Sequence, residues 1–328
     1  MNPPWWRHAR RRLAGRPQEP TGASDAPRAP PARQTQAWLE ARLLIRMYYA
    51  GVLYFAFADA PGWADMAATG NASLLWPVAW AHVTGMTAAA LIVATLYLGG
   101  ALAAAMAPDR RLCRGLAALG LLMFTALHYS AGKIGHGTHL WVLTSIVFVF
   151  LPAQGAATPP DRRGRQDYLN VFWTAHALVL LTYSMSGLGK VFGALWQATQ
   201  GQVTAFHPQA MALHIADRML ETSSQNPVGL WLADHVWASW PLMLGTIYLQ
   251  LFAFWAIFRP RLLRIWTVGL ILFHLATYLT LTIRFAPPVL LLAMWGLASP
   301  FAPEKAGLRA ILADLPLVAP GWRFFSKK

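Results

Sequence analysis

Long apolar stretches recur along this chain between residues 43 and 301, and short polar connections separate them. A helix needs roughly 20 residues to cross the hydrocarbon core of a bilayer, which is about 30 Å thick. Stretches of this length with almost no charge are typical of membrane-spanning helices. The sequence therefore predicts an all-α, polytopic membrane helix bundle. We expect about eight transmembrane helices, at Leu43–Ala60, Val78–Met106, Leu112–Tyr129, Ile134–Pro152, Tyr168–Lys190, Pro241–Phe258, Leu262–Ile283 and Phe285–Phe301.

The distribution of basic residues supports this number of spans, because cytoplasmic loops carry an excess of lysine and arginine. The chain holds 27 Lys+Arg and 13 Asp+Glu, which gives a net charge of +14 with neutral histidines. When the N-terminus is placed in the cytoplasm and eight spans alternate, the outer side keeps only Lys133, Lys190, Arg218 and Arg284. We therefore expect both termini to be cytoplasmic and the protein to lie in the cell (inner) membrane. A chain with only 12% charged residues is not a typical nucleic-acid-binding protein, so we expect no nucleic-acid partner.

The segments outside the apolar stretches divide the chain into three parts. Residues 1–40 are basic and rich in proline, alanine and glycine, and we expect a disordered cytoplasmic tail rather than a cleaved signal peptide. Residues 41–302 form the predicted membrane domain, and residues 303–328 form a short basic tail. The domain includes a long outer loop, 195–240, in which Met211–Leu220 and Leu230–Trp237 are predicted to be interfacial amphipathic helices.

Lys190 is the most informative polar residue, because polar groups at membrane depth need a partner, water or a function. It ends a segment that contains Ser184, Ser186, Gly187 and Gly189, small residues that favour close helix packing. A lysine shielded from water can act as a base near neutral pH. The alternative is a lysine that extends its amine to the outer interface.

The histidines allow several interpretations. His136 and His139 are three residues apart and would share a helix face, and with His82 and His128 they could bind a metal or a haem. No carboxylate accompanies them and no HExxH motif occurs, so we favour interfacial hydrogen bonding and predict no metal site. His176 and His274 are predicted to be polar links between helices. The single cysteine, Cys113, excludes internal disulfides and cysteine-rich metal sites.

Three segments carry a family resemblance. Lys133–Leu143 is an outer turn before an apolar helix that ends in Leu-Pro; Ser186–Lys190 is followed by Trp196 and Gly201; Phe273–Thr277 is followed by Phe285. In this order they resemble the vitamin K-dependent gamma-carboxylase-like membrane domain, also called the HTTM domain, over about residues 41–301. The middle segment is similar to the family's Ala-Gly-x-x-Lys…Trp…Gly pattern and is the most specific of the three.

The resemblance implies chemistry on a quinol. In the carboxylase a lysine deprotonates vitamin K hydroquinone and a histidine assists, so Lys190 takes the position of the base and His136 or His139 that of its partner. We expect His128, Trp196 and His274 to belong to the cofactor-binding region. The departures are a Lys190-to-Trp196 spacing one residue longer and Gln250 where the family often has glutamate. The chain also ends soon after the last span, so we do not expect carboxylation of protein glutamates.

The sequence is therefore compatible with three classes of function. The first is redox or proton-abstraction chemistry on a small lipophilic substrate, with a quinone or quinol as the cofactor. The second is a non-catalytic subunit that binds lipid or quinone within a membrane complex. The third is a haem or metal-binding membrane protein. All three predict membrane lipids as partners, and the second predicts a membrane-protein partner as well.

Overall fold

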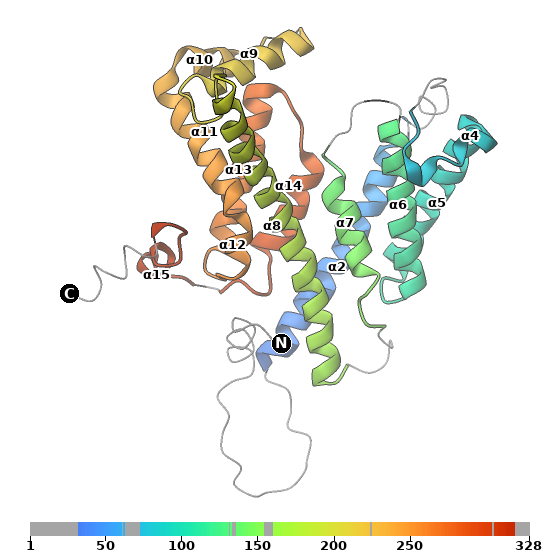
Figure 1. Cartoon of the computed structure of the whole chain (residues 1–328). Helices are drawn as coiled ribbons and strands as arrows, with labels where there is room; N and C mark the ends of the chain where they lie inside the picture. Colours follow the sequence, from blue (N-terminus) through green and yellow to red (C-terminus); the bar gives the residue numbers. More distant parts are fainter. Residues whose placement is uncertain are drawn as a thin grey trace, which may run out of the picture.

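The computed structural model is helical and contains no strand in the part of the chain that it describes (Figure 1). The described residues are 32–60, 62, 73–130, 132, 136–153, 160–223, 225–303 and 305–318. The prediction of an all-α chain is confirmed. The helices of the first half are α2 (Ala32–Ala58), η1 (Trp76–Val78), α4 (Ala81–Thr84), α5 (Met86–Met106), α6 (Arg111–Ser130), α7 (His139–Phe148) and α8 (Arg162–Thr199). Those of the second half are α9 (Ala210–Thr222), α10 (Pro227–Asp234), α11 (Val236–Leu251), α12 (Ala253–Ile257), α13 (Leu263–Leu281), α14 (Ala286–Leu292), η2 (Ala293–Leu297) and α15 (Leu308–Leu312).

Four of these helices are long and apolar enough to cross a membrane, namely α5, α6, α8 and α13. Their surfaces support the same conclusion, because large apolar side chains such as Leu91, Leu102 and Leu272 are exposed to the surroundings of the protein. A soluble protein exposes apolar residues singly, whereas continuous exposed apolar faces mark contact with lipid or a partner. These observations support a membrane protein.

The other four predicted spans coincide with helices that are short, interrupted or less apolar. Helix α7 has 10 residues and therefore extends over about 15 Å. The sixth predicted span is divided into α11 and α12 at Phe252, and the eighth consists of α14 and the five-residue π-helix η2. Helix α2 has 27 residues but includes several charged side chains near its start. The second predicted span begins later than expected, at Met86, because Gly85 takes a positive φ of 82° and separates α4 from α5.

The predicted tail 1–40 is wrong at its boundary, because α2 already begins at Ala32. The start of α2 is held by tertiary contacts: the side-chain amide of Gln34 donates to the side chain of Gln166 at 3.2 Å, and Trp38 is buried. Residues 1–31, on which the rest of the disorder prediction falls, lie outside the described residues.

The tail predicted at 303–328 is in part folded against the bundle. Asp314 receives two ion pairs, from Arg259 at 3.9 Å and from Arg261 at 3.5 Å. The hydroxyl of Tyr248 in α11 donates to the carbonyl of Pro316 at 2.9 Å. This segment is therefore attached to α11 and to the loop after α12. The composition of residues 303–328 does not indicate this attachment.

Helix α8 connects the two halves of the molecule. In Figure 1 it runs diagonally, with α5, α6 and α7 on one side of it and α11 and α12 on the other, while α14 lies between α8 and α7. An aromatic core joins the first half to η2: Tyr48 stacks on Trp141 and on Trp295, with ring centroids 4.9 and 5.7 Å apart. The hydroxyl of Tyr48 donates to the carbonyl of Trp141 at 2.6 Å. This core fixes α2, α7 and η2 against one another and so shapes the space at their outer ends.

Of the two helices predicted in the loop 195–240, Met211–Leu220 is present within α9, whereas Leu230–Trp237 is divided between α10, which ends at Asp234, and α11, which begins at Val236. Helices α9 and α10 lie across one end of the bundle, beside the ends of α11 and α13 (Figure 1). Helix α10 begins where the sequence favours it, because the side chain of Asn226 accepts hydrogen bonds from the amides of Val228 and Gly229 and Pro227 occupies the first turn. This end of the bundle is the one that the charge pattern assigns to the outer side.

Candidate functional site

Lys190 lies in the last third of α8, on a face that is partly exposed. Its Nζ donates a hydrogen bond to Oγ of Ser186 at 3.1 Å, one turn earlier on the same helix. The neighbouring side chains Phe192 and Trp196 are exposed and apolar. Among the described residues, no contact joins Lys190 to an imidazole. The geometry therefore matches an amine that extends along its own helix, and the role of base stays a prediction.

The small residues before Lys190 do pack closely, on the neighbouring face of α8. A Cβ on Gly187 would lie 2.4 Å from the backbone nitrogen of Leu251, at the end of α11. Oγ of Ser184 accepts a hydrogen bond from the amide of Phe254 at 2.8 Å. Ser186 and Gly189 are exposed. The prediction of close helix packing is thus confirmed for Ser184 and Gly187, which hold α8 against the interruption between α11 and α12.

Three of the four histidines in the predicted group, His128, His136 and His139, lie around Tyr129 at the C-terminal end of α6. Nδ1 of His136 lies 3.3 Å from Nδ1 of His139, and the His139 ring meets the Tyr129 ring edge-on at 5.3 Å. The His128 ring lies 5.6 Å from the same tyrosine. Within the described ranges, no group of three or more metal-ligating side chains is placed to hold an ion. Lys133, which belongs to the same turn, lies outside the described residues.

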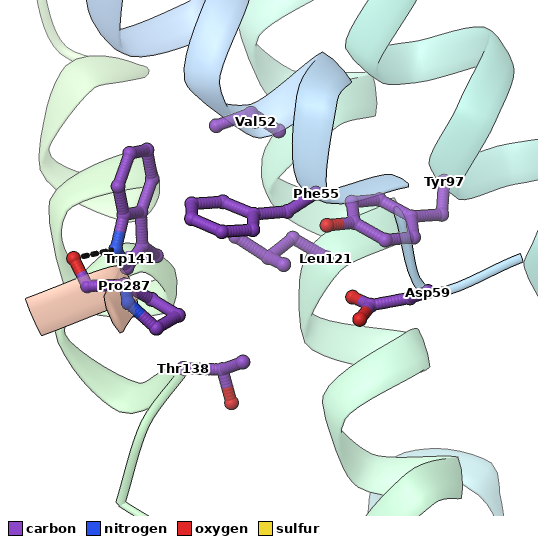
Figure 2. Close-up of a pocket in the computed structure, with 8 residues that line it drawn as sticks. All are labelled: Val52, Phe55, Asp59, Tyr97, Leu121, Thr138, Trp141 and Pro287. Atoms are coloured by element: carbon purple, nitrogen blue, oxygen red, sulfur yellow. Dashed lines mark hydrogen bonds between the residues drawn. The ribbon is translucent and has the colours of Figure 1, made fainter. Parts of the chain in front are cut away.

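A cavity of about 50 Å³ opens beside this group, and we call it the outer pocket (Figure 2). Phe55 and Asp59 reach it from the end of α2, and Tyr97 reaches it from α5. In Figure 2 the Tyr97 ring and the Asp59 carboxyl lie on one side of the space, with Trp141 and Pro287 on the other. The indole Nε1 of Trp141 donates to the carbonyl of Pro287 at 2.9 Å. The complete lining is Val52, Phe55, Asp59, Tyr97, Leu121, Thr138, Trp141 and Pro287.

The outer pocket combines an apolar wall with a few polar groups, which is typical of sites for small molecules. Asp59 supplies a carboxyl, Tyr97 a phenol and Thr138 a hydroxyl. The Asp59 carboxyl is close enough to Tyr97 and to His128 for electrostatic interaction. Thr138 also shares a hydrogen bond of 2.7 Å with the hydroxyl of Tyr129, so the pocket and the histidine group are connected.

The size of the outer pocket limits what it can hold. One water molecule needs roughly 10–15 Å³ of such space, whereas an apolar cavity of roughly 150 Å³ accepts benzene. The observed volume of about 50 Å³ lies between the two. The pocket therefore fits the edge of a ring or a small polar head group, and a whole aromatic head group requires side chains such as Phe55 to move.

His274 and His176 lie away from the outer pocket and within the helix bundle. Nε2 of His274, in α13, is hydrogen-bonded to the hydroxyl of Tyr183, in α8, at 2.7 Å. The Phe285 ring covers the imidazole, with the ring centroids 4.8 Å apart. The prediction of a polar link between helices is confirmed for His274. The same prediction is wrong for His176, which is buried in α8 and whose Nδ1 has no hydrogen-bond partner among the described residues. Trp196, predicted to lie near a cofactor, is exposed on the same helix.

Sequence reasoning missed most residues of the outer pocket. Tyr97 and Trp141 lie inside apolar stretches, where aromatic residues are common and carry no distinguishing signal. Thr138 is a single hydroxyl residue between His136 and His139 and carries no signal of its own. The simplest interpretation of Asp59 from the sequence is the end of the first helix, with Lys133 or Lys190 as an alternative ion-pair partner. An acidic residue at the end of a predicted span, where few carboxylates occur, is the one signal that could have pointed to this site.

Scans against protein-family models and searches of curated proteins and of solved structures find no match to this chain. The resemblance to the HTTM domain therefore stays a prediction that rests on the quoted segments.

Proposed function

We propose that this chain is a multi-pass membrane protein that binds a small lipid-soluble molecule by its polar head group in the outer pocket. The observation that carries the proposal is the lining of this pocket, in which one carboxyl, one phenol and one hydroxyl face apolar and aromatic side chains. A quinone or quinol has the matching chemistry, with oxygen atoms at the edge of a planar apolar ring. The small cavity volume favours entry of that edge alone.

The more specific form of the proposal is proton abstraction from a quinol hydroxyl. Asp59 lines the pocket and can accept such a proton, while Tyr97 and Thr138 can orient the hydroxyl by hydrogen bonding. His128, which interacts electrostatically with Asp59, is exposed and can pass the proton to water. The resemblance to the HTTM domain instead assigns this proton to Lys190, with His136 or His139 as its partner.

We further propose eight spans with both termini in the cytoplasm and a location in the inner membrane. Helices stand at all eight predicted positions. The shorter ones, α7 and α14 with η2, pack against longer helices, and broken or short helices at membrane depth are tolerated where protein surrounds them. The positive-inside pattern supplies the orientation.

The experiment that tests the function uses the full chain, purified in a neutral detergent and titrated with a short-chain quinone such as ubiquinone-1. Wild type is expected to bind it, and Val52→Phe, which fills the pocket, is expected to abolish binding. Val83→Phe makes the same change at an exposed position of α4 and serves as the control. Asp59→Asn keeps the volume but removes the charge, and binding is expected to weaken by about tenfold or more.

Turnover separates catalysis from simple binding. With dissolved oxygen as the acceptor of the two electrons, oxidation of the deprotonated quinol is expected to be lost in Asp59→Asn and retained in Lys190→Ala. Loss of oxidation in Lys190→Ala with unchanged binding would support the role that the resemblance assigns to the lysine. If the wild type bound the quinone without oxidising the quinol, the protein would be a quinone-binding subunit. If wild type and Val52→Phe bound the quinone equally, the outer pocket would not be its binding site.

A further inference from the structure

A second concavity lies where the end of α13 meets the start of α10, and we call it the outer groove. It has a volume of about 470 Å³ and shares no lining residue with the outer pocket. Helices α10 and α13 approach closely here, because a Cβ on Gly229 would lie 2.7 Å from the carbonyl oxygen of Thr280. Thr282 then takes a positive φ of 58° and ends α13. This turn brings Arg284 to the groove, which Asn226, Val228, Tyr278 and Leu279 also line.

The two arginines at this end of the molecule differ in their partners. Nε of Arg218 donates to the carbonyl of Leu281 at 3.3 Å, and its Nη1 is paired with the carboxylate of Glu221 at 3.4 Å. The guanidinium of Arg284 lies over the Tyr278 ring, 5.7 Å from its centroid. No described residue provides Arg284 with a hydrogen-bond acceptor or a carboxylate. A guanidinium carries five N–H donors in a fork that suits phosphate, so Arg284 is available to bind an anion.

An apolar stripe leads along α13 to this guanidinium. Val268, Leu272, Leu275 and Leu279 follow one another at helical spacing and are all exposed. The stripe extends over 11 residues, or about 16 Å. This length is close to half of the roughly 30 Å hydrocarbon core, which is the depth of one leaflet. An acyl chain on the stripe and a charged head group at Arg284 would therefore fit one lipid molecule.

We propose that the outer groove binds the phosphate of an outer-leaflet phospholipid through Arg284, with the acyl chains along the exposed stripe of α13. The side chain of Asn226 lines the same groove, and its Nδ2 can donate to the phosphate, because Oδ1 already accepts from the amides of Val228 and Gly229. The hydroxyl of Thr282 donates to the carbonyl of Leu281 at 2.7 Å and can only accept from the head group. Such a lipid connects α10 to α13, since the groove is formed by both. The inference does not depend on the outer pocket or on any turnover there.

The test uses the full chain in a neutral detergent, with dioctanoyl phosphatidylglycerol as the probe and native mass spectrometry to count bound lipids and to measure their dissociation constants. Arg284→Gln is expected to retain one tightly bound lipid fewer than wild type, with that site weakened by about tenfold. Val228→Glu places a carboxylate in the groove while leaving Arg284 intact and is expected to lose the same lipid. Arg218→Gln removes an equal charge from the same end of the protein and is expected to keep it.

Two further probes distinguish a phospholipid from its parts. Dioctanoylglycerol, which lacks the phosphate, and inorganic phosphate, which lacks the chains, are both expected to bind at least tenfold more weakly than the phospholipid. Equal lipid counts in wild type and Arg284→Gln would overturn the proposal. So would binding of either fragment as tight as that of the whole lipid, because the groove would then recognise only an apolar molecule or a free anion.

Discussion

The contact between α8 and α11 depends on the absence of a side chain at Gly187. A Cβ at this position would lie 2.4 Å from the nitrogen and 2.6 Å from the Cα of Leu251, and 2.8 Å from the carbonyl carbon of Gln250. All three are backbone atoms, so no rotamer change can make room. Gly187→Ala therefore forces the two helices apart by about 1 Å, until the contact reaches ordinary van der Waals distance.

The size of the effect follows from three contributions. Overpacking of a well-packed core costs about 1–3 kcal/mol. The hydrogen bond from the amide of Phe254 to Oγ of Ser184, now 2.8 Å, would lengthen beyond bonding distance at a cost of about 1 kcal/mol. Alanine in place of glycine within a helix recovers about 1 kcal/mol. We therefore expect Gly187→Ala to lower the free energy of unfolding by about 1–3 kcal/mol.

Thermal unfolding of the purified protein in detergent measures this change, and a Tm lower by several degrees is expected, since about 1 kcal/mol shifts the Tm of a large domain by roughly 2–4 °C. Gly189→Ala is the matched control, because this glycine lies two residues away in the same helix with no atom within 4 Å of its added Cβ. It is expected to be neutral or slightly stabilising. If both variants were equally stable, the close contact between α8 and α11 would be refuted.

Two further predictions concern the polar link inside the bundle and the topology. The 2.7 Å hydrogen bond between Tyr183 and His274 predicts a coupling energy of about 0.6–1 kcal/mol in a double-mutant cycle of Tyr183→Phe and His274→Ala, measured by thermal or denaturant unfolding. Quinone binding is expected to stay unchanged. If the effects of the two substitutions on stability were additive, this hydrogen bond would be contradicted. The topology is tested on a Cys113→Ser background with a membrane-impermeant maleimide. Trp196→Cys is expected to react in intact cells, whereas Arg309→Cys is expected to react only after the cells are permeabilised. The reverse pattern would overturn the proposed orientation.

The comparison between prediction and structure is clearest in the helices. Strong hydropathy predicted α6 and α13 to within a few residues, because a helix surrounded by lipid must satisfy its backbone internally and needs an apolar surface. For α7, Ile134–Pro152 was expected and His139–Phe148 is observed, with residues 134 and 135 outside the described part of the chain. After Phe148 the chain turns at Val149 and Phe150, and Leu151 is buried without being helical, which an apolar pattern does not distinguish from a longer helix.

In the candidate site, too, the sequence predicted contacts between neighbouring segments better than contacts between distant ones. The histidines at 128, 136 and 139 were expected to act together, and their proximity around Tyr129 follows from the short connection between α6 and α7. Lys190 was expected to join them, but this required a contact between helices that are distant in the chain. The side chain instead bonds Ser186, because the face of α8 on which Lys190 stands is partly exposed.

The sequence by itself determined that this protein is helical and that it suits a membrane. These properties depend on the composition and order of residues along single helices, which the solvent and the backbone control directly. Only the tertiary structure decided that Asp59, Tyr97 and Trp141 surround one cavity and that Arg284 stands over Tyr278 without a protein acceptor among the described residues. These depend on which faces of distant helices meet, and close contacts such as that at Gly187 select those faces.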